Sequence, residues 1–304
     1  MAPPDQCIRR FIDVDGVSIH ALHWPRPGAP PLLLLHATGF LADLWRRVVE
    51  GLRALYDVAA LDLRGHGRSD RPGGRYDFPT LAGDVAGALD ALGWRDVYAV
   101  GHSTGGGLAR IVAARRPELV RRVFGLEPIV PTPSRRPAGP TRKNRGSLAD
   151  GARLRRAGFP SRAAAEARWR DRPPFATWDP EVFRDYVKHG LAEQDDGSVV
   201  LRCPPPVEAR VFDSGAAFDA APYLRDVRCP VMLAQGQHTD RVFDAMLTRA
   251  APLLSDAERL TIPGASHLAP MEFPALVADE IRAFDATPAP GDPAEPIARP
   301  RAHA

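Results

Sequence analysis

Cysteine and long apolar runs are scarce in this chain of 304 residues. Its three cysteines, Cys7, Cys203 and Cys229, are odd in number and far apart, which excludes a disulfide framework or a zinc knuckle. No apolar run approaches the roughly 20 residues of a membrane-spanning helix, and residues 1–10 lack the apolar stretch of a signal peptide. We therefore predict a cytoplasmic protein without a membrane partner.

Lysine is almost absent, since Lys143 and Lys188 are the only lysines among 40 basic residues. The arginines form clusters spread along the chain without an aromatic platform between them, so no nucleic-acid partner is predicted. No two of the nine histidines have the helical i, i+4 spacing beside a carboxylate that a metal site uses. We expect neither a metal nor another cofactor. The sequence leaves the oligomeric state open.

One serine stands between an apolar strand and a helix of small residues. Residues 96–100 have the pattern of a short buried strand, and residues 106–113 that of a helix. Between them lies Gly-His-Ser-Thr-Gly, at 101–105. A Gly-x-Ser-x-Gly at such a corner forms a nucleophile elbow, because glycines tolerate the tight turn where larger residues would clash. Ser103 is therefore the predicted nucleophile.

A nucleophilic serine needs a base and an orienting acid within hydrogen-bond reach. Asp240 follows an apolar strand at 230–236, and His267 follows another at 258–262. Both residues lie on loops after strands, as Ser103 does, and such loops converge at one edge of a parallel sheet. We predict His267 as the base and Asp240 as the acid.

Strand and helix patterns alternate along most of the chain. Residues 8–14 and 17–24 form a predicted hairpin around the favoured turn Asp15-Gly16. Alternating units predict a mostly parallel sheet with helices on both faces. The predicted helices span 41–55, 80–92, 104–116, 241–253 and 272–284.

The alternation stops after Pro128. Residues 131–146 are rich in proline, glycine and arginine, and helical patterns follow at 162–170, 180–192 and 207–217 before strands return at 230. The last stretch is rich in proline and alanine without an apolar period. We predict a core at 1–130, a helical cap at 131–221, the rest of the core at 222–285 and a disordered tail at 286–304.

Several segments of the chain resemble motifs of the α/β-hydrolase family, over residues 8–130 and 222–285. Residues 32–40 are similar to its strand and His-Gly loop, 62–70 to its glycine-rich turn, and 264–274 to its catalytic-histidine loop. The resemblance implies an eight-stranded, mostly parallel sheet with a helical cap after the sixth strand. Residues 41–45 and 103–107 are also similar to the esterase and cofactor-free haloperoxidase branch.

The resemblance also implies roles for further residues. The backbone N–H groups of Thr38 and Thr104 would form the oxyanion hole. The chain has Ala37 where the family usually has glycine, with Gly39 two positions later, so the Gly39 amide is an alternative to that of Thr38. Some members place the acid after the sixth strand, which makes Glu127 the alternative to Asp240.

Three histidines near the predicted site have structural rather than chemical explanations. His36 supports the oxyanion loop, and His102 extends away from the direction of the serine. His238 precedes the last strand and lacks the loop context of His267.

The predicted function is cleavage of a carboxylic ester, lactone or thioester of a small, largely apolar molecule through an acyl-enzyme. A carbon–carbon bond hydrolase, amidase, perhydrolase or acyltransferase would use the same residues, and a ligand receptor can keep the fold and the triad. The cap is rich in aromatic residues that build its own core or face the cleft: Trp169, Phe175, Trp178, Phe183, Tyr186, Phe212 and Phe218. Arg135, Arg136 and Arg142 near the start of the cap could attract a carboxylate, although a solvated loop explains them as well.

Overall fold

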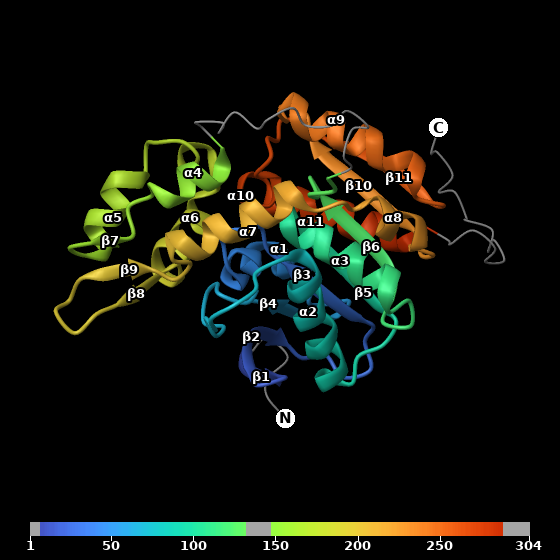
Figure 1. The fold of residues 1–304 in the computed structure, drawn as a ribbon, viewed down its shortest axis with the longest axis horizontal. Helices are drawn as coiled ribbons and strands as arrows, with labels where there is room; N and C mark the ends of the chain where they lie inside the picture. The colour runs from blue at the N-terminus through green and yellow to red at the C-terminus, as the bar shows by residue number, and fades with distance from the viewer. Residues whose placement is uncertain (1–6, 132–146, 288–304) are drawn as a thin grey trace, which may run out of the picture.

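A computed structural model describes residues 7–131 and 147–287. Its centre is a single eight-stranded sheet (Figure 1). Only the pairs β1–β2 and β2–β4 are antiparallel, and the other five are parallel. The predicted mostly parallel sheet of eight strands is therefore confirmed. Across the sheet the order is β1 (Ile8–Val14), β2 (Val17–Trp24), β4 (Asp57–Leu61), β3 (Pro31–Leu35), β5 (Val97–His102), β6 (Val120–Leu126), β10 (Val231–Gly236) and β11 (Ala257–Ile262).

The first two strands form the hairpin that the sequence predicts. Asp15 and Gly16 both have positive φ, 50° and 77°, as a two-residue turn between twisted strands requires. The pairing then runs from Val14 opposite Val17 to Ile8 opposite His23.

Both faces of the sheet are covered by helices, because its central strands are apolar on both sides. Along β3, Leu33 and Leu35 enter one core while Leu32 and Leu34 enter the other, as alternation in a strand dictates. All four side chains are buried. The first core includes α2 (Phe78–Leu92), α3 (Thr104–Arg115), α8 (Ala221–Asp226) and α9 (Arg241–Ala250), and the second includes α1 (Arg46–Glu50) and α11 (Pro274–Ala286).

Three of the predicted helices are divided in the structure. The stretch 241–253 is α9 followed by the 3-10 turn η3 (Ala251–Leu253). The stretch 41–55 contains a 3-10 turn, η1 (Ala42–Trp45), followed by the short helix α1. The stretch 272–284 contains the end of α10 (Ala269–Glu272) and then α11, which begins at Pro274. Proline has no N–H to donate and is favoured in the first turn of a helix, so it begins a new helix there.

An insert follows β6 and lies to one side of the sheet, with α7 leading back toward it (Figure 1). Its helices α5, α6 and α7 were predicted from the sequence, but α4 and the small antiparallel sheet, in the order β7–β9–β8, were not. The helix predicted over 180–192 ends at His189, and Leu191 begins a strand. The elements are α4 (Leu148–Arg153), β7 (Gly158–Phe159), α5 (Arg162–Trp169), η2 (Phe175–Thr177), α6 (Pro180–His189), β8 (Leu191–Glu193), β9 (Val199–Leu201) and α7 (Pro205–Ala217).

Most aromatic residues of the insert pack together. Phe175 stacks on Trp169 and Tyr186, with ring centroids 5.3 Å apart in both pairs. Trp178 and Phe183 belong to the same cluster. Two aromatics lie elsewhere: Phe218 stacks on Phe78 of α2 at 5.3 Å, and Phe212 packs on a small cluster of α4 and α7.

Some sequence predictions lie outside the described residues. These are the three arginines of the insert's first segment, Arg135, Arg136 and Arg142, and the tail from residue 288 onward. Within residues 7–131 and 147–287, no helix combines the length and apolarity needed to cross a membrane.

Candidate active site

Ser103 occupies a strained turn between β5 and α3. Its φ of 52° and ψ of −113° lie outside the regions that non-glycine residues favour. The turn closes tightly, since a Cβ on Gly105 would come within 2.3 Å of the Leu35 carbonyl oxygen. A Cβ on Gly101 would meet the Gly105 backbone at the same distance. The glycines of the motif are therefore required by close backbone approach.

The turn leaves polar groups of Ser103 and Thr104 available. Ser103 is the N-cap residue of α3, but its side chain makes no capping hydrogen bond. Thr104 is the first residue of the helix, and its N–H has no carbonyl partner within the helix. Ser103, Thr38 and His267 line the same cavity of about 720 Å³.

The carboxylate in contact with His267 belongs to Glu127. Oε2 of Glu127 lies 3.1 Å from Nδ1 of His267 and also accepts the hydroxyl of Thr239 at 2.5 Å. Oε1 accepts the N–H of Gly236 at 2.7 Å. Glu127 is 1 % exposed and follows β6 with a φ of 45°. Three donors, two at the end of β10 and one on the histidine loop, thus fix the carboxylate. The Nε2 atom of His267 makes no contact with it.

Asp240, the acid favoured from the sequence, does not make this contact. It is exposed, and its Oδ1 accepts the N–H of Val242 at 2.9 Å as the N-cap of α9. An aspartate before a helix satisfies an N–H that lacks an intrahelical partner, and Asp240 does so. The expectation that Asp240 holds the imidazole is therefore corrected: the alternative, Glu127, occupies that place, and Asp240 lines the cavity nearby.

Neighbouring rings hold the backbone and ring of His267. Nε2 of His102 donates to the His267 carbonyl at 2.8 Å. Burial, with a smaller effect of His267, lowers the pKa of His102 well below its ordinary value, so His102 stays neutral. The ring of Phe243 stacks on the imidazole of His267 at 4.1 Å. The structural role expected for His102 fits this contact, whereas the sequence offered no signal for Phe243.

The two loops expected to form the oxyanion hole are adjacent. The hydroxyl oxygens of Thr38 and Thr104 lie 2.6 Å apart, and both residues are buried. Gly39 has a φ of 85°, and a Cβ there would come within 2.5 Å of the Glu208 carboxylate. The wall of the cavity includes Ala37 and Thr38, while Gly39 packs against Glu208 from the insert.

His36 supports this loop, as expected. Its Nδ1 donates to the Ala37 carbonyl at 2.8 Å, and its Nε2 accepts the N–H of Leu63 at 3.0 Å. Burial lowers its pKa, which keeps the ring in the neutral form that can accept at Nε2.

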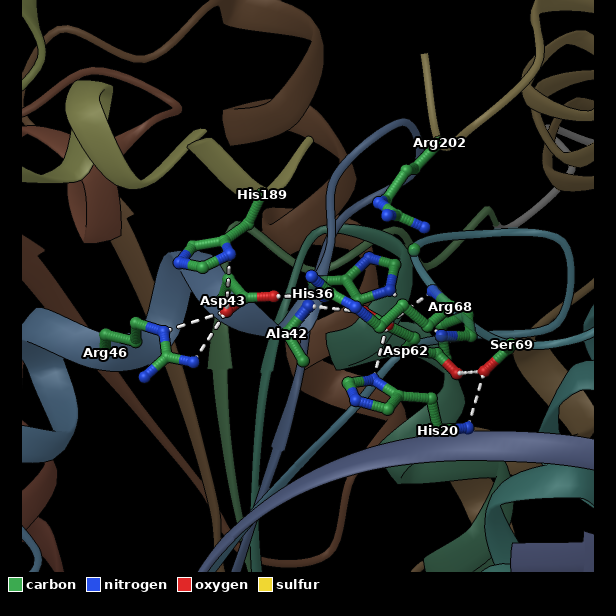
Figure 2. A network of polar contacts seen from close by, with 12 residues as sticks. His20, His36, Ala42, Asp43, Arg46, Asp62, Arg68, Ser69, His189 and Arg202 are labelled. Atoms are coloured by element: carbon green, nitrogen blue, oxygen red, sulfur yellow. Dashed lines mark hydrogen bonds and ion pairs between the residues drawn. The ribbon is translucent and has the colours of Figure 1, made fainter. Parts of the chain in front are cut away.

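Two buried aspartates tie the loops behind the site together (Figure 2). Asp62 accepts from Nδ1 of His20 and from the N–H of Ala42 at 2.7 Å, and from the N–H of Arg68 at 2.8 Å. Burial by itself would raise the pKa of Asp62. The hydrogen bond and charge of His20, together with further neighbours, outweigh burial, so the pKa lies below its ordinary value. The glycine-rich turn and the start of η1 are thereby joined through one carboxylate.

The second aspartate, Asp43, connects this region to the insert. It accepts from Arg46 at 2.8 Å and from Arg68 at 3.0 Å, and Nδ1 of His189 on α6 lies 3.6 Å away (Figure 2). Burial lowers the pKa of His189 to about 4, so this contact involves a neutral imidazole. The core and the insert thus meet at a buried polar network.

The insert supplies both apolar and charged walls to the cavity. Its aromatic walls include Trp169, Phe175 and Phe212. Arg155 donates to both Glu208 oxygens at 3.0 Å and to the Tyr186 hydroxyl at 2.7 Å. The remaining arginines of the wall are Arg168 and Arg172. Sequence reasoning found the aromatics but not these charged residues, because their meeting depends on the packing of α4, α5 and α7.

A metal site does not form from the residues described. Across 7–131 and 147–287, no three His, Cys, Asp or Glu side chains are grouped as metal ligands would be.

Comparison with known proteins identifies the family and fold of the chain. A family model described as "alpha/beta hydrolase fold" matches residues 30–274. The chain is 27% identical over 265 residues to the 2-(acetamidomethylene)succinate hydrolase of Mesorhizobium japonicum, covering 86% of this chain and 90% of that protein. It is also 40% identical over 120 residues to a non-heme chloroperoxidase of Streptomyces lividans, a match that covers 38% of this chain and 43% of that protein.

The solved structure of E-2-(acetamidomethylene)succinate hydrolase has a TM-score of 0.78 to this chain, with 23% identity, covering 93% of this chain and all of that one. A thioesterase domain from the curacin biosynthetic pathway has a TM-score of 0.73 and 22% identity, covering 91% and 100%. At these identities the structures support the fold alone. The family model spans most of the sequence, and the chain therefore belongs to the alpha/beta hydrolase fold family and is a hydrolase.

Proposed function

We propose that this hydrolase cleaves a carboxylic ester, lactone or thioester of a small, mainly apolar molecule through an acyl-enzyme on Ser103. His267 acts as the base, and Glu127 orients it. The observation that carries the proposal is the contact of 3.1 Å between Nδ1 of His267 and the buried Glu127 carboxylate, beside a strained serine that lines the same cavity.

In the first step the Ser103 oxygen attacks the carbonyl carbon while Nε2 of His267 takes the hydroxyl proton. The Glu127 carboxylate accepts Nδ1–H, which sets the tautomer and stabilises the imidazolium. The carbonyl oxygen becomes an oxyanion, and the N–H groups of Thr38 and Thr104 are its proposed donors.

Collapse of the oxyanion breaks the bond to the leaving group, which departs with the proton from His267. Water then attacks the acyl-enzyme as His267 takes a proton from it, and the carboxylic acid leaves as Ser103 regains its proton. The chain's own residues supply every proton transfer in this cycle.

The cavity supports a small substrate with an apolar body. Phe40, Trp169, Phe175, Phe212 and Phe243 line it, and its volume of about 720 Å³ is within the usual range for small-molecule sites. Aromatic walls exclude water and strengthen electrostatic interactions at the oxyanion.

An amide bond is the second candidate. The relative that matches over 90% of its own length is named for hydrolysis of 2-(acetamidomethylene)succinate, a molecule with an acetamido group. An amidase would use the same three residues, with His267 protonating a leaving nitrogen instead of oxygen.

The test is labelling of the purified protein by a fluorophosphonate probe, beside Ser103→Ala, with matched p-nitrophenyl esters and p-nitroanilides of the same short acids. We expect labelling and ester turnover that both vanish in the Ser103→Ala protein. Faster turnover of the anilides than of the esters would favour the amidase. Absence of labelling and of turnover in the wild type would overturn the proposal and favour a ligand receptor.

A further inference from the structure

Three arginines line the cavity that contains Ser103, and one of them is neutralised within the protein. Arg155 contacts both Glu208 oxygens at 3.0 Å, and Glu208 is 6 % exposed. Its second terminal nitrogen donates to Tyr186. The charge of Arg155 is thus matched by a carboxylate at the same place, so Arg155 leaves no net charge for a ligand.

The other two arginines have no such partner. Arg168 lies in the last turn of α5, and Arg172 follows the helix by three residues. Among the residues described, neither guanidinium has a hydrogen bond or an ion pair, whereas Arg170 between them pairs with Glu166. Both Arg168 and Arg172 are exposed yet line the cavity, so they stand where it opens to solvent.

The acidic residues of the cavity wall do not balance these two charges. Glu208 is used by Arg155, and Asp240 accepts the N–H of Val242 at the start of α9. Figure 1 shows α9 well separated from α5. A cleft lined by one sign of charge concentrates ligands of the opposite sign, and this opening is cationic.

We propose that the substrate carries a carboxylate remote from the bond that is cleaved, and that Arg168 and Arg172 bind it. This inference rests on the proposed function and narrows its substrate to a monoester, or other acyl derivative, of a small dicarboxylic acid. Guanidinium groups bind carboxylates through paired N–H donors, which fixes orientation as well as charge. The aromatic walls then hold the carbon chain between the arginines and Ser103.

The test compares two esters with the same acyl chain and leaving group, whose remote carboxyl is either free or methylated: mono-p-nitrophenyl glutarate and its methyl-capped diester. We expect the wild type to favour the charged ester in kcat/KM by about tenfold at low salt, because charge-assisted hydrogen bonds are among the stronger ones. High salt reduces this ratio, since the arginines are exposed. Arg168→Gln and Arg172→Gln each lower the ratio by about fivefold, and the double variant lowers it to near one.

The matched control is Arg170→Gln, which removes an exposed arginine between the two and is expected to retain the wild-type ratio. If the wild type hydrolyses the neutral ester but does not favour the charged one, the inference is wrong and the proposed function stands. If Arg170→Gln lowers the ratio of charged to neutral ester as much as Arg168→Gln does, the inference is also wrong. If neither ester is hydrolysed and Ser103 is not labelled, the proposed function fails and this inference fails with it.

Discussion

The sheet and the insert contribute different kinds of residue to one cavity. Ser103, Glu127 and His267 each follow a strand, and hydrogen bonds to neighbouring strands hold the first two in place: Ser103 N–H to Leu126 and Glu127 N–H to Ala234, both at 2.8 Å. The insert contributes aromatic and arginine side chains from short helices. Groups that need fixed geometry thus come from the sheet, while groups that select a substrate come from the attached insert.

The two regions are joined mainly through side chains. Arg47 donates to Asp185 of α6 at 3.0 Å, and Thr177 donates to Glu272 of α10 at 2.7 Å. Glu272 also accepts the N–H of Ser266, beside His267, at 2.8 Å. The insert is thus connected to the histidine loop without contributing a strand to the main sheet.

The largest expected effect comes from breaking the rigid layer. Gly105→Ala places a methyl group within 2.3 Å of the Leu35 carbonyl oxygen, so one backbone must move. We expect a loss of about 4 kcal/mol in unfolding free energy and loss of serine labelling. Gly151→Ala in α4 of the insert is the control, because no atom lies within 4 Å of its new methyl. Urea unfolding would contradict the account if the two variants were equally stable.

The next effect concerns the network behind the site. Asp62→Asn removes a charge that is fully buried beside His20. We expect the free energy of unfolding to fall by about 3 kcal/mol at neutral pH. Because the folded-state pKa of Asp62 lies below its ordinary value of 3.8, its contribution is present above that value and is lost as pH falls through the folded pKa. The gap in stability between wild type and variant should therefore narrow in acid. A gap independent of pH would contradict this.

Two arginines, one in each region, differ in whether they have a partner. Arg155 of the insert is paired with Glu208, whereas Arg110 of α3 is buried without a hydrogen-bond partner among the described residues, and burial lowers its pKa to about 9. We expect Arg155→Met to lower the free energy of unfolding by about 2 kcal/mol, since it leaves Glu208 unpaired. Arg110→Met should raise the free energy of unfolding by about 1 kcal/mol. Thermal unfolding of both variants tests the opposite signs, and a loss of stability in both would contradict the expectation for Arg110.

The smallest effects compare equivalent helix caps. Asp77 caps α2 in the core by accepting the N–H of Thr80 at 2.9 Å, and Asp179 caps α6 in the insert by accepting that of Glu181 at 2.8 Å. Alanine at either position should lower the free energy of unfolding by about 1 kcal/mol. We expect Asp179→Ala also to raise KM, because α6 belongs to the layer that lines the cavity, and Asp77→Ala to leave KM unchanged. Steady-state kinetics on one ester separates the two.

Local patterns predicted the parts of the molecule that local interactions determine. The hairpin follows from Asp15-Gly16, and the serine turn follows from a strand, two glycines and a helix. The short strands of the insert were missed because Leu191–Glu193 has three residues, too few for an alternation to be recognised.

The partner of His267 could not be chosen from the sequence. Glu127 and Asp240 both follow strands, and the choice depends on the turn at Glu127, whose φ of 45° directs the carboxylate beneath the histidine loop. Asp240 precedes a helix and caps it, which local sequence also permits. The pairing of Arg155 with Glu208 joins residues 53 positions apart and is set by tertiary packing.

The role of Glu127 as the partner of His267 is tested by kcat of Glu127→Gln beside Asp240→Asn, on the best p-nitrophenyl ester. Glutamine keeps the shape of the side chain, but its NH₂ group can donate to Nδ1 and so favour the wrong tautomer of His267. We therefore predict that kcat falls by about 10³-fold or more. Asparagine retains the cap of α9, and kcat should stay within about threefold of wild type. A large loss in Asp240→Asn with little change in Glu127→Gln would contradict the account.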